Sequence, residues 1–211
     1  MTSNDVIRLA GWAAILSAAT TVLMVAAAIL TQTLHLGNTF AVLVMASMTL
    51  MAAVALGLHL ILRSQRQALC LAAAAIGILG MLLTVLVHAL KIAGNLTVEQ
   101  FNTLGEGIGP GAIGLWLLVA NFLALRGGRL PRVLRVVGLV AGAGYLASGL
   151  GALIGGPRTL TEGPQNALSS IGPLGIFLVY PVWAAWLGAW VLRNYARLVP
   201  AVESHDPAAA S

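Results

Sequence analysis

The chain has 211 residues, of which 59% are hydrophobic and only 8% are charged, and its mean hydropathy is +0.95. A soluble domain carries about 25% charged residues, so most of this surface must face lipid rather than water. The net charge of +5 does not indicate nucleic-acid binding, because the few arginines lie beside apolar segments, where basic residues act as topology signals. The single cysteine, Cys70, excludes an intramolecular disulfide.

Six apolar segments follow in chain order, each long enough to cross a hydrocarbon core of roughly 30 Å as a helix. The first is longer than the apolar core of a cleaved signal peptide, and more apolar sequence follows at once, which favours an uncleaved span. The sequence therefore predicts one all-α domain over residues 1–199, an integral membrane bundle, followed by a disordered polar tail over 200–211. We expect the six spans at residues 9–32, 40–62, 68–90, 107–125, 136–154 and 168–192.

The polar segment between the third and fourth predicted spans covers residues 91–106. It contains Thr97-Val98-Glu99-Gln100, the pattern of a capping box, in which the side chains of the first and fourth residues bond to each other's backbone N–H groups. We therefore predict that a short amphipathic helix begins there, with Thr97 as its N-cap.

The basic residues predict the orientation of the bundle. Six spans place both termini on one side, and basic residues in short loops collect on the cytoplasmic side. The side that holds the termini carries nine of the eleven basic residues: Arg8, Arg63, Arg66, Arg126, Arg129, Arg132, Arg135, Arg193 and Arg197. The other side carries Lys91 and Arg158. We therefore expect cytoplasmic N- and C-termini, and the Ala, Gly, Leu, Val and Arg bias of the chain suggests a bacterial plasma membrane (the inner membrane).

The strongest basic element lies between the fourth and fifth spans, where ten residues carry four arginines: Arg126, Arg129, Arg132 and Arg135. Each basic residue near an anionic membrane surface gains about 1 kcal/mol. We expect these four side chains to face the cytoplasmic lipid headgroups. Docking of an acidic cytoplasmic partner is the alternative interpretation.

No Asp, Glu, Lys or Arg lies inside the six predicted spans. Because intramembrane charges are costly and are kept for ion or proton pathways, this argues against a proton-driven pump but leaves room for a neutral solute or lipid. The residues expected on the outer side include His35, His88, Glu99 and Glu106. Imidazoles and carboxylates can bind zinc or another divalent metal, but no HxxxH or HExxH spacing is present, so folding alone would have to assemble such a site.

Uncharged polar residues inside the spans are candidates to line a cavity. They are Thr20, Thr49, Thr84, Asn121, Tyr145 and Ser148, and His59 joins them at the inner end of the second span. Haem would need two histidines at matching depth, and His59 and His88 lie toward opposite faces, so we expect no cofactor. Gly138 and Gly142, four residues apart, favour close helix packing.

The segment Arg126-Gly-Gly-Arg129-Leu-Pro131-Arg132-Val-Leu-Arg135-Val-Val-Gly138-Leu-Val-Ala-Gly142-Ala-Gly144-Tyr145-Leu resembles the bacterial membrane family called domain of unknown function 4386. The proline-tryptophan segment from Tyr180 to Gly188, the Arg8-Leu-Ala-Gly11 opening and the six-span layout are similar too. The resemblance implies a six-helix bacterial integral membrane protein without an established activity, and it supplies no catalytic residue.

Three functions remain open from the sequence. The first is a non-enzymatic accessory or structural membrane component, which would act with a membrane-protein partner or as a homo-oligomer. The second is a small carrier of a neutral or lipid-like solute. The third is a membrane enzyme or metal-binding protein with an outward-facing site. The sequence favours the first, because no catalytic constellation is recognisable in it.

Overall fold

The computed structural model describes residues 2–34, 37–64, 66–155 and 172–203, and within these ranges it is all-α with no strand. The helices in chain order are α1 (Ser3–Leu34), α2 (Gly37–Leu62), α3 (Gln67–Ile92), α4 (Val98–Gln100), η1 (Phe101–Ile108), α5 (Gly109–Gly127), α6 (Arg132–Gly155), η3 (Gly175–Val179) and α8 (Tyr180–Glu203). Helices η1 and η3 are π-helices. Helix α8 includes residues 200–203, so the expectation that these four residues belong to a disordered polar tail is wrong. The rest of that predicted tail, 204–211, lies outside the described residues.

Six helical stretches are long and apolar enough to cross a membrane. Their bounds are Asn4–Leu30, Asn38–Leu62, Gln67–Ile92, Val98–Gly127, Arg132–Ile154 and Gly172–Leu198. These stretches overlap the six segments predicted from hydropathy, and their composition is that of a multi-pass membrane protein. Many large apolar side chains, such as Leu79 and Ile29, are exposed on the outside of the bundle, as expected for helices that contact lipid.

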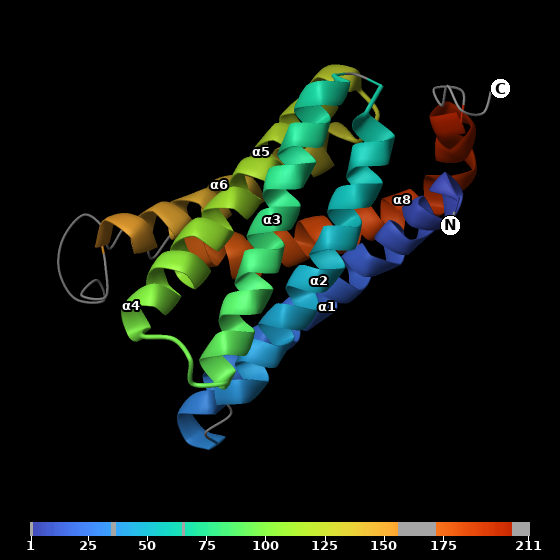
Figure 1. Ribbon diagram of the computed structural model, residues 1–211. Helices are drawn as coiled ribbons and strands as arrows, with labels where there is room; N and C mark the ends of the chain where they lie inside the picture. The colour runs from blue at the N-terminus through green and yellow to red at the C-terminus, as the bar shows by residue number, and fades with distance from the viewer. Residues whose placement is uncertain (1, 35–36, 65, 156–171, 204–211) are drawn as a thin grey trace.

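The contacts between helices follow the chain order and close a ring. Figure 1 shows α2 and α3 side by side, with α8 passing behind them. Helix α1 packs against α2, α2 against α3, α3 against α5, and α5 against α6. Helix α6 in turn packs against η3 and α8. Extensive contact between α8 and α1 closes the ring. Contacts across the ring are sparse, since α2 touches α5 and α8 only slightly. This arrangement leaves a central axis that all six spans surround.

Glycines let neighbouring helices of the ring approach closely. A side chain on Gly142 of α6 would meet the backbone of α5, with Leu118 N at 2.9 Å and Gly114 O at 3.1 Å. Gly144 of α6 packs in the same way against Gly175 of η3. Close approach replaces the hydrophobic driving force that is missing between helices in lipid. The predicted packing role of Gly138 and Gly142 is confirmed, because a Cβ on Gly138 would overlap the side chain of Asn121 on α5.

The capping box at Thr97 is confirmed. The Thr97 hydroxyl accepts from Gln100 N at 3.2 Å, and the Gln100 side chain accepts from Thr97 N at 3.0 Å. The helix that begins there does not stop after one turn, as a short helix would, but continues through η1 into α5. The prediction that residues up to 106 lie outside the fourth helical stretch is therefore wrong. Glu106 is part of that stretch, because the cap starts it at Val98.

The arginine segment joins the ends of three helices. Arg135 donates from Nη1 to Ala124 O at 2.9 Å and to Leu125 O at 3.0 Å, at the C-terminal end of α5. Arg129 donates to Ile61 O at 2.7 Å, at the end of α2. Both side chains are half-buried, so these two differ from the expectation that all four arginines face lipid headgroups. Helix termini carry unpaired carbonyls, and a guanidinium group with several N–H donors satisfies them.

The other two arginines of this segment, Arg126 and Arg132, are exposed. The guanidinium carbon of Arg126 lies 4.6 Å from the centre of the Phe122 ring, one turn earlier. The bond from Arg129 to Ile61 also places the arginine turn beside the turn at Arg63, so two basic turns share one end of the bundle.

Candidate functional site

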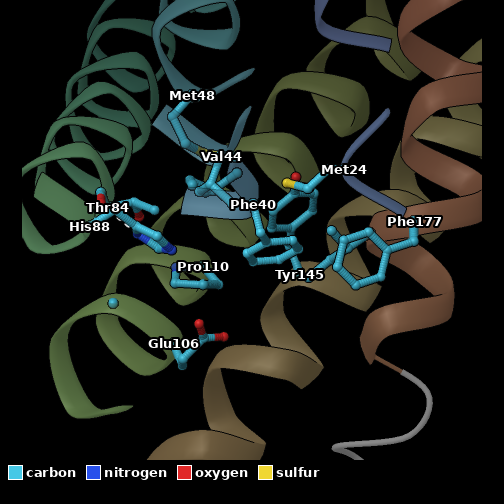
Figure 2. Close-up of a pocket in the computed structure, with 13 residues that line it drawn as sticks. Met24, Phe40, Val44, Met48, Thr84, His88, Glu106, Pro110, Tyr145 and Phe177 are labelled. Atoms are coloured by element: carbon cyan, nitrogen blue, oxygen red, sulfur yellow. Dashed lines mark hydrogen bonds between the residues drawn. The ribbon is translucent and has the colours of Figure 1, made fainter. Parts of the chain in front are cut away.

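A cavity of about 70 Å³ lies inside the ring of helices. Every one of the six spans contributes to its wall (Figure 2). The lining side chains come from α1 (Met24), α2 (Phe40, Val44, Met48), α3 (Thr84, His88), η1 (Gly105, Glu106), α5 (Pro110, Ile113), α6 (Tyr145) and η3 (Ile176, Phe177). Since a water molecule needs roughly 10–15 Å³ of such space, the cavity has room for several waters or for a small ligand group.

His88 is a deeply buried ionisable group of this wall, with 3% of its surface exposed. Its Nδ1 lies 2.9 Å from the backbone oxygen of Thr84. A carbonyl oxygen only accepts, so Nδ1 carries the proton and donates, and in the neutral imidazole Nε2 must then be an acceptor. The ring also packs edge-to-face on Phe101, with centroids 5.2 Å apart. These two contacts fix the imidazole, and Figure 2 shows it directed into the cavity near Pro110.

Glu106 supplies a carboxylate to the same cavity. It is half-buried in η1, and its carboxylate points toward the space beside Pro110 (Figure 2). No ion pair to Glu106 is present in the described part of the chain. Lys91 lies near this end of the bundle, but its Nζ sits 3.6 Å from the centre of the Phe101 ring. That cation–π contact holds Lys91 against an aromatic face, so the carboxylate keeps its acceptor capacity.

Two π-helical segments border the cavity from different spans. Gly105 and Glu106 belong to η1, and Ile176 and Phe177 belong to η3. A π-helix has i→i+5 hydrogen bonds, is rare, and is frequently found at functional sites. Close contacts at glycine hold both segments in place, Gly105 against Val87 and Gly175 against Gly144.

The remaining wall is mainly apolar. Thr84 donates its hydroxyl to Gly80 O at 2.9 Å, so the hydroxyl proton is engaged and its oxygen can accept. Tyr145 is 2% exposed and packs edge-to-face on Tyr180, with centroids 5.7 Å apart. Its hydroxyl has no hydrogen-bond partner among the described residues. Phe40 and Phe177 add two aromatic rings, so the wall combines a few acceptors with apolar and aromatic surface, as small-molecule sites usually do.

The candidate metal ligands do not assemble as a set. His88 and Glu106 line one cavity, but Glu99 is exposed on α4 and is not part of the wall. His35 lies outside the described residues. Within the ranges that the structure describes, no three His, Cys, Asp or Glu side chains come together in a way that could hold a metal ion. The capping box explains the position of Glu99, because it places this residue on the exposed first turn of the helix.

The other predicted polar residues lie apart from the cavity, except for Tyr145 and Thr84. Asn121 is 1% exposed and donates from Nδ2 to Leu117 O at 2.8 Å. His59 lines a second space of about 10 Å³ with Cys70 and Trp116. Ser148 packs against Gly172, at the start of the last span. Asn121 and Ser148 are therefore in helix contacts rather than in the central cavity.

Sequence reasoning missed a set of hydroxyl groups that join α1 to its neighbours. The Ser17 and Tyr180 hydroxyl oxygens are 2.8 Å apart, and the Thr21 and Ser47 hydroxyl oxygens are 3.2 Å apart. Ser17, Thr21, Ser47 and Tyr180 are all buried. The spacing of Ser17 and Thr21, one helical turn apart in an apolar run, was the available signal. It indicates one polar face on the first span.

Comparison of the chain with protein-family models, with curated proteins and with solved structures found no match. The resemblance to the family called domain of unknown function 4386 therefore stays a prediction.

Proposed function

We propose that the protein is a non-enzymatic, multi-pass protein of a bacterial plasma membrane that binds a small, mainly apolar ligand at the centre of its helical ring. The observation that carries this proposal is the cavity to which all six spans contribute. A structural component needs no such space, because packed helices are more stable without it. The apolar and aromatic wall with its few acceptors fits a ligand that carries one polar group.

The orientation belongs to the same proposal. The termini and the basic turns face the cytoplasm, because basic residues in short loops are retained there. Support comes from the bond between Arg129 and Ile61, which joins two basic turns at one end of the bundle. His88 lies one turn before Lys91, near the opposite end of α3. The cavity then belongs to the outer half of the membrane, where a ligand enters from the outer leaflet or the outside.

A comparison of what the purified protein retains tests ligand binding. The full chain is purified in detergent, and the small molecules that co-purify are identified by mass spectrometry against an empty-micelle control. Val44→Phe fills the cavity, since Val44 is 7% exposed and lines it. Val42→Phe is the matched control, because Val42 on the same helix is 52% exposed. We expect Val44→Phe to lose most of the retained ligand and Val42→Phe to keep it.

Two results of this experiment would contradict the proposal. If the wild type retains nothing above the micelle control, or if both variants retain as much as the wild type, the cavity is not a ligand site. In that case the accessory or structural role that the sequence favours is the better account. Circular dichroism and size-exclusion profiles of both variants verify that they are folded.

Carriage of a neutral or lipid-like solute is a second candidate function, and one observation favours it. Irregular helices from two different spans, η1 and η3, flank the cavity, and interrupted helices at a central site are characteristic of transporters. Uptake of the identified ligand into proteoliposomes, with Val44→Phe as the blocked variant, tests carriage.

A further inference from the structure

We infer that the cavity selects a ligand with a cationic or strongly donating head, and that the chemical class is a protonated aliphatic amine. This inference rests on the proposed function and names the class of its ligand. The polar atoms of the wall are mainly hydrogen-bond acceptors. His88 Nε2, the Glu106 carboxylate and the Thr84 hydroxyl oxygen all present acceptor capacity to the cavity. The Tyr145 hydroxyl is the one donor without a partner in the described part of the wall, so acceptors outnumber free donors there.

His88 offers a hydrogen-bond acceptor to the cavity. Because Nδ1 donates to Thr84 O at 2.9 Å, the neutral ring offers only a lone pair at Nε2. The side chain is 3% exposed, and Nε2 has no partner among the described residues. Nε2 is therefore an acceptor available to a ligand in the cavity. A ligand that donates a hydrogen bond can pair with it, whereas a ligand that only accepts meets a repulsive lone pair.

Glu106 contributes a carboxylate that favours a cationic ligand. Glu106 shares the cavity with His88, and neither lysine nor arginine is among the lining residues. Lys91, which stands nearest in the sequence to His88, has its ammonium group over the Phe101 ring instead. The charge of Glu106 is therefore unbalanced within the described part of the chain. A cation in the cavity would restore the balance and form charge-assisted hydrogen bonds.

The aromatic part of the wall also favours an ammonium group. Phe40, Tyr145 and Phe177 line the cavity with the carboxylate on one side (Figure 2). Aromatic faces attract ammonium groups and also accommodate alkyl chains, whereas an anionic head gains no attraction from the aromatic faces. An aliphatic amine matches both parts of the wall, since its ammonium group donates to His88 and Glu106 while its carbons contact the aromatic and aliphatic side chains.

Three probes with the same alkyl chain test this inference: hexylammonium, 1-hexanol and hexanoate. Equilibrium dialysis of the full chain in detergent at neutral pH, against empty micelles, measures their binding. We expect hexylammonium to bind most tightly and hexanoate most weakly. Glu106→Gln should weaken hexylammonium binding about tenfold or more, as expected for the loss of a charge-assisted hydrogen bond, and should affect 1-hexanol less. Glu99→Gln, at an exposed carboxylate on the same helical stretch, should change neither.

A second variant tests the histidine. His88→Phe keeps an aromatic ring but removes the acceptor at Nε2, so the preference for hexylammonium over hexanoate should fall. The ranking of the three probes on the wild type decides the question even if a variant does not fold. If 1-hexanol binds as tightly as hexylammonium, and Glu106→Gln changes neither, the ligand cavity stands but the amine assignment is overturned. If no probe binds better to the wild type than to Val44→Phe, both the cavity function and this inference fail.

Discussion

The hydroxyl oxygens of Tyr180 and Ser17 lie 2.8 Å apart and join the last span to the first. Hydrogen bonds between transmembrane helices contribute about 0.6 kcal/mol on average. Tyr180→Phe should therefore lower the free energy of unfolding by about 0.6–1.7 kcal/mol, measured by thermal denaturation in detergent. Tyr195→Phe, on the same helix, is the control, because its hydroxyl has no hydrogen-bond partner within the described residues. Equal stability of the two variants would show that this bond does not hold the ring closed.

Arg135 should contribute more to stability than Arg132, although the two are neighbours on one helix. Arg135 binds two carbonyls at the end of α5, whereas Arg132 is exposed. We expect Arg135→Ala to lower the free energy of unfolding by about 1–2 kcal/mol and Arg132→Ala to have little effect. Thermal denaturation of the two variants in the same detergent measures the difference. A larger loss for Arg132→Ala would contradict the assignment of Arg135 as the residue that caps α5.

Gly142 and Gly111 provide a test of helix packing. A Cβ on Gly142 would meet backbone atoms of α5, including Leu118 N at 2.9 Å, but a Cβ on Gly111 has nothing within 4 Å. Gly142→Ala should therefore destabilise the bundle, since backbone cannot move aside locally. Gly111→Ala should be neutral or stabilising by up to about 1 kcal/mol, because alanine favours the helix. Unfolding midpoints in detergent decide, and similar effects of the two substitutions would refute close packing at Gly142.

Reporter fusions test the proposed orientation. Fusions after Arg66 and Leu130, in the two basic turns, should report a cytoplasmic location. A fusion after Gly94, in the turn before Thr97, should report the outside. The reason is the retention of basic turns on the cytoplasmic side. Phosphatase activity and green fluorescence at each position provide complementary readings, and the reverse pattern would place the cavity in the inner half of the membrane.

The sequence predicted the helices better than it predicted the cavity. Hydropathy alone locates six spans, since each is an apolar run of sufficient length, and the Thr97 capping box follows from four residues. The position of Glu106 in the cavity wall could not be predicted from hydropathy, because hydropathy treats a charged residue as the end of a span. Its place in the wall depends on the winding of η1 and on contacts with α3, such as that between Gly105 and Val87.

The roles of individual polar residues depend in the same way on contacts between distant parts of the chain. Arg129 was expected at the lipid surface, yet its partner is the carbonyl of Ile61, 68 positions earlier in the chain. Tyr180 and Ser17 are 163 positions apart. Hydropathy and local spacing contain no information about which helices become neighbours, so these pairs could not be read from the sequence.

The π-helical winding of η1 also determines what the deletion of one residue would do to the cavity. A π-helical turn behaves as an α-helix into which an additional residue has been inserted. Deletion of one residue between the Thr97 cap and Gly109 would let the segment return to α-helical winding, and it would rotate the side chains on one side of the deletion by about 100° relative to those on the other. Such a chain would keep all six spans and lose the carboxylate from its centre.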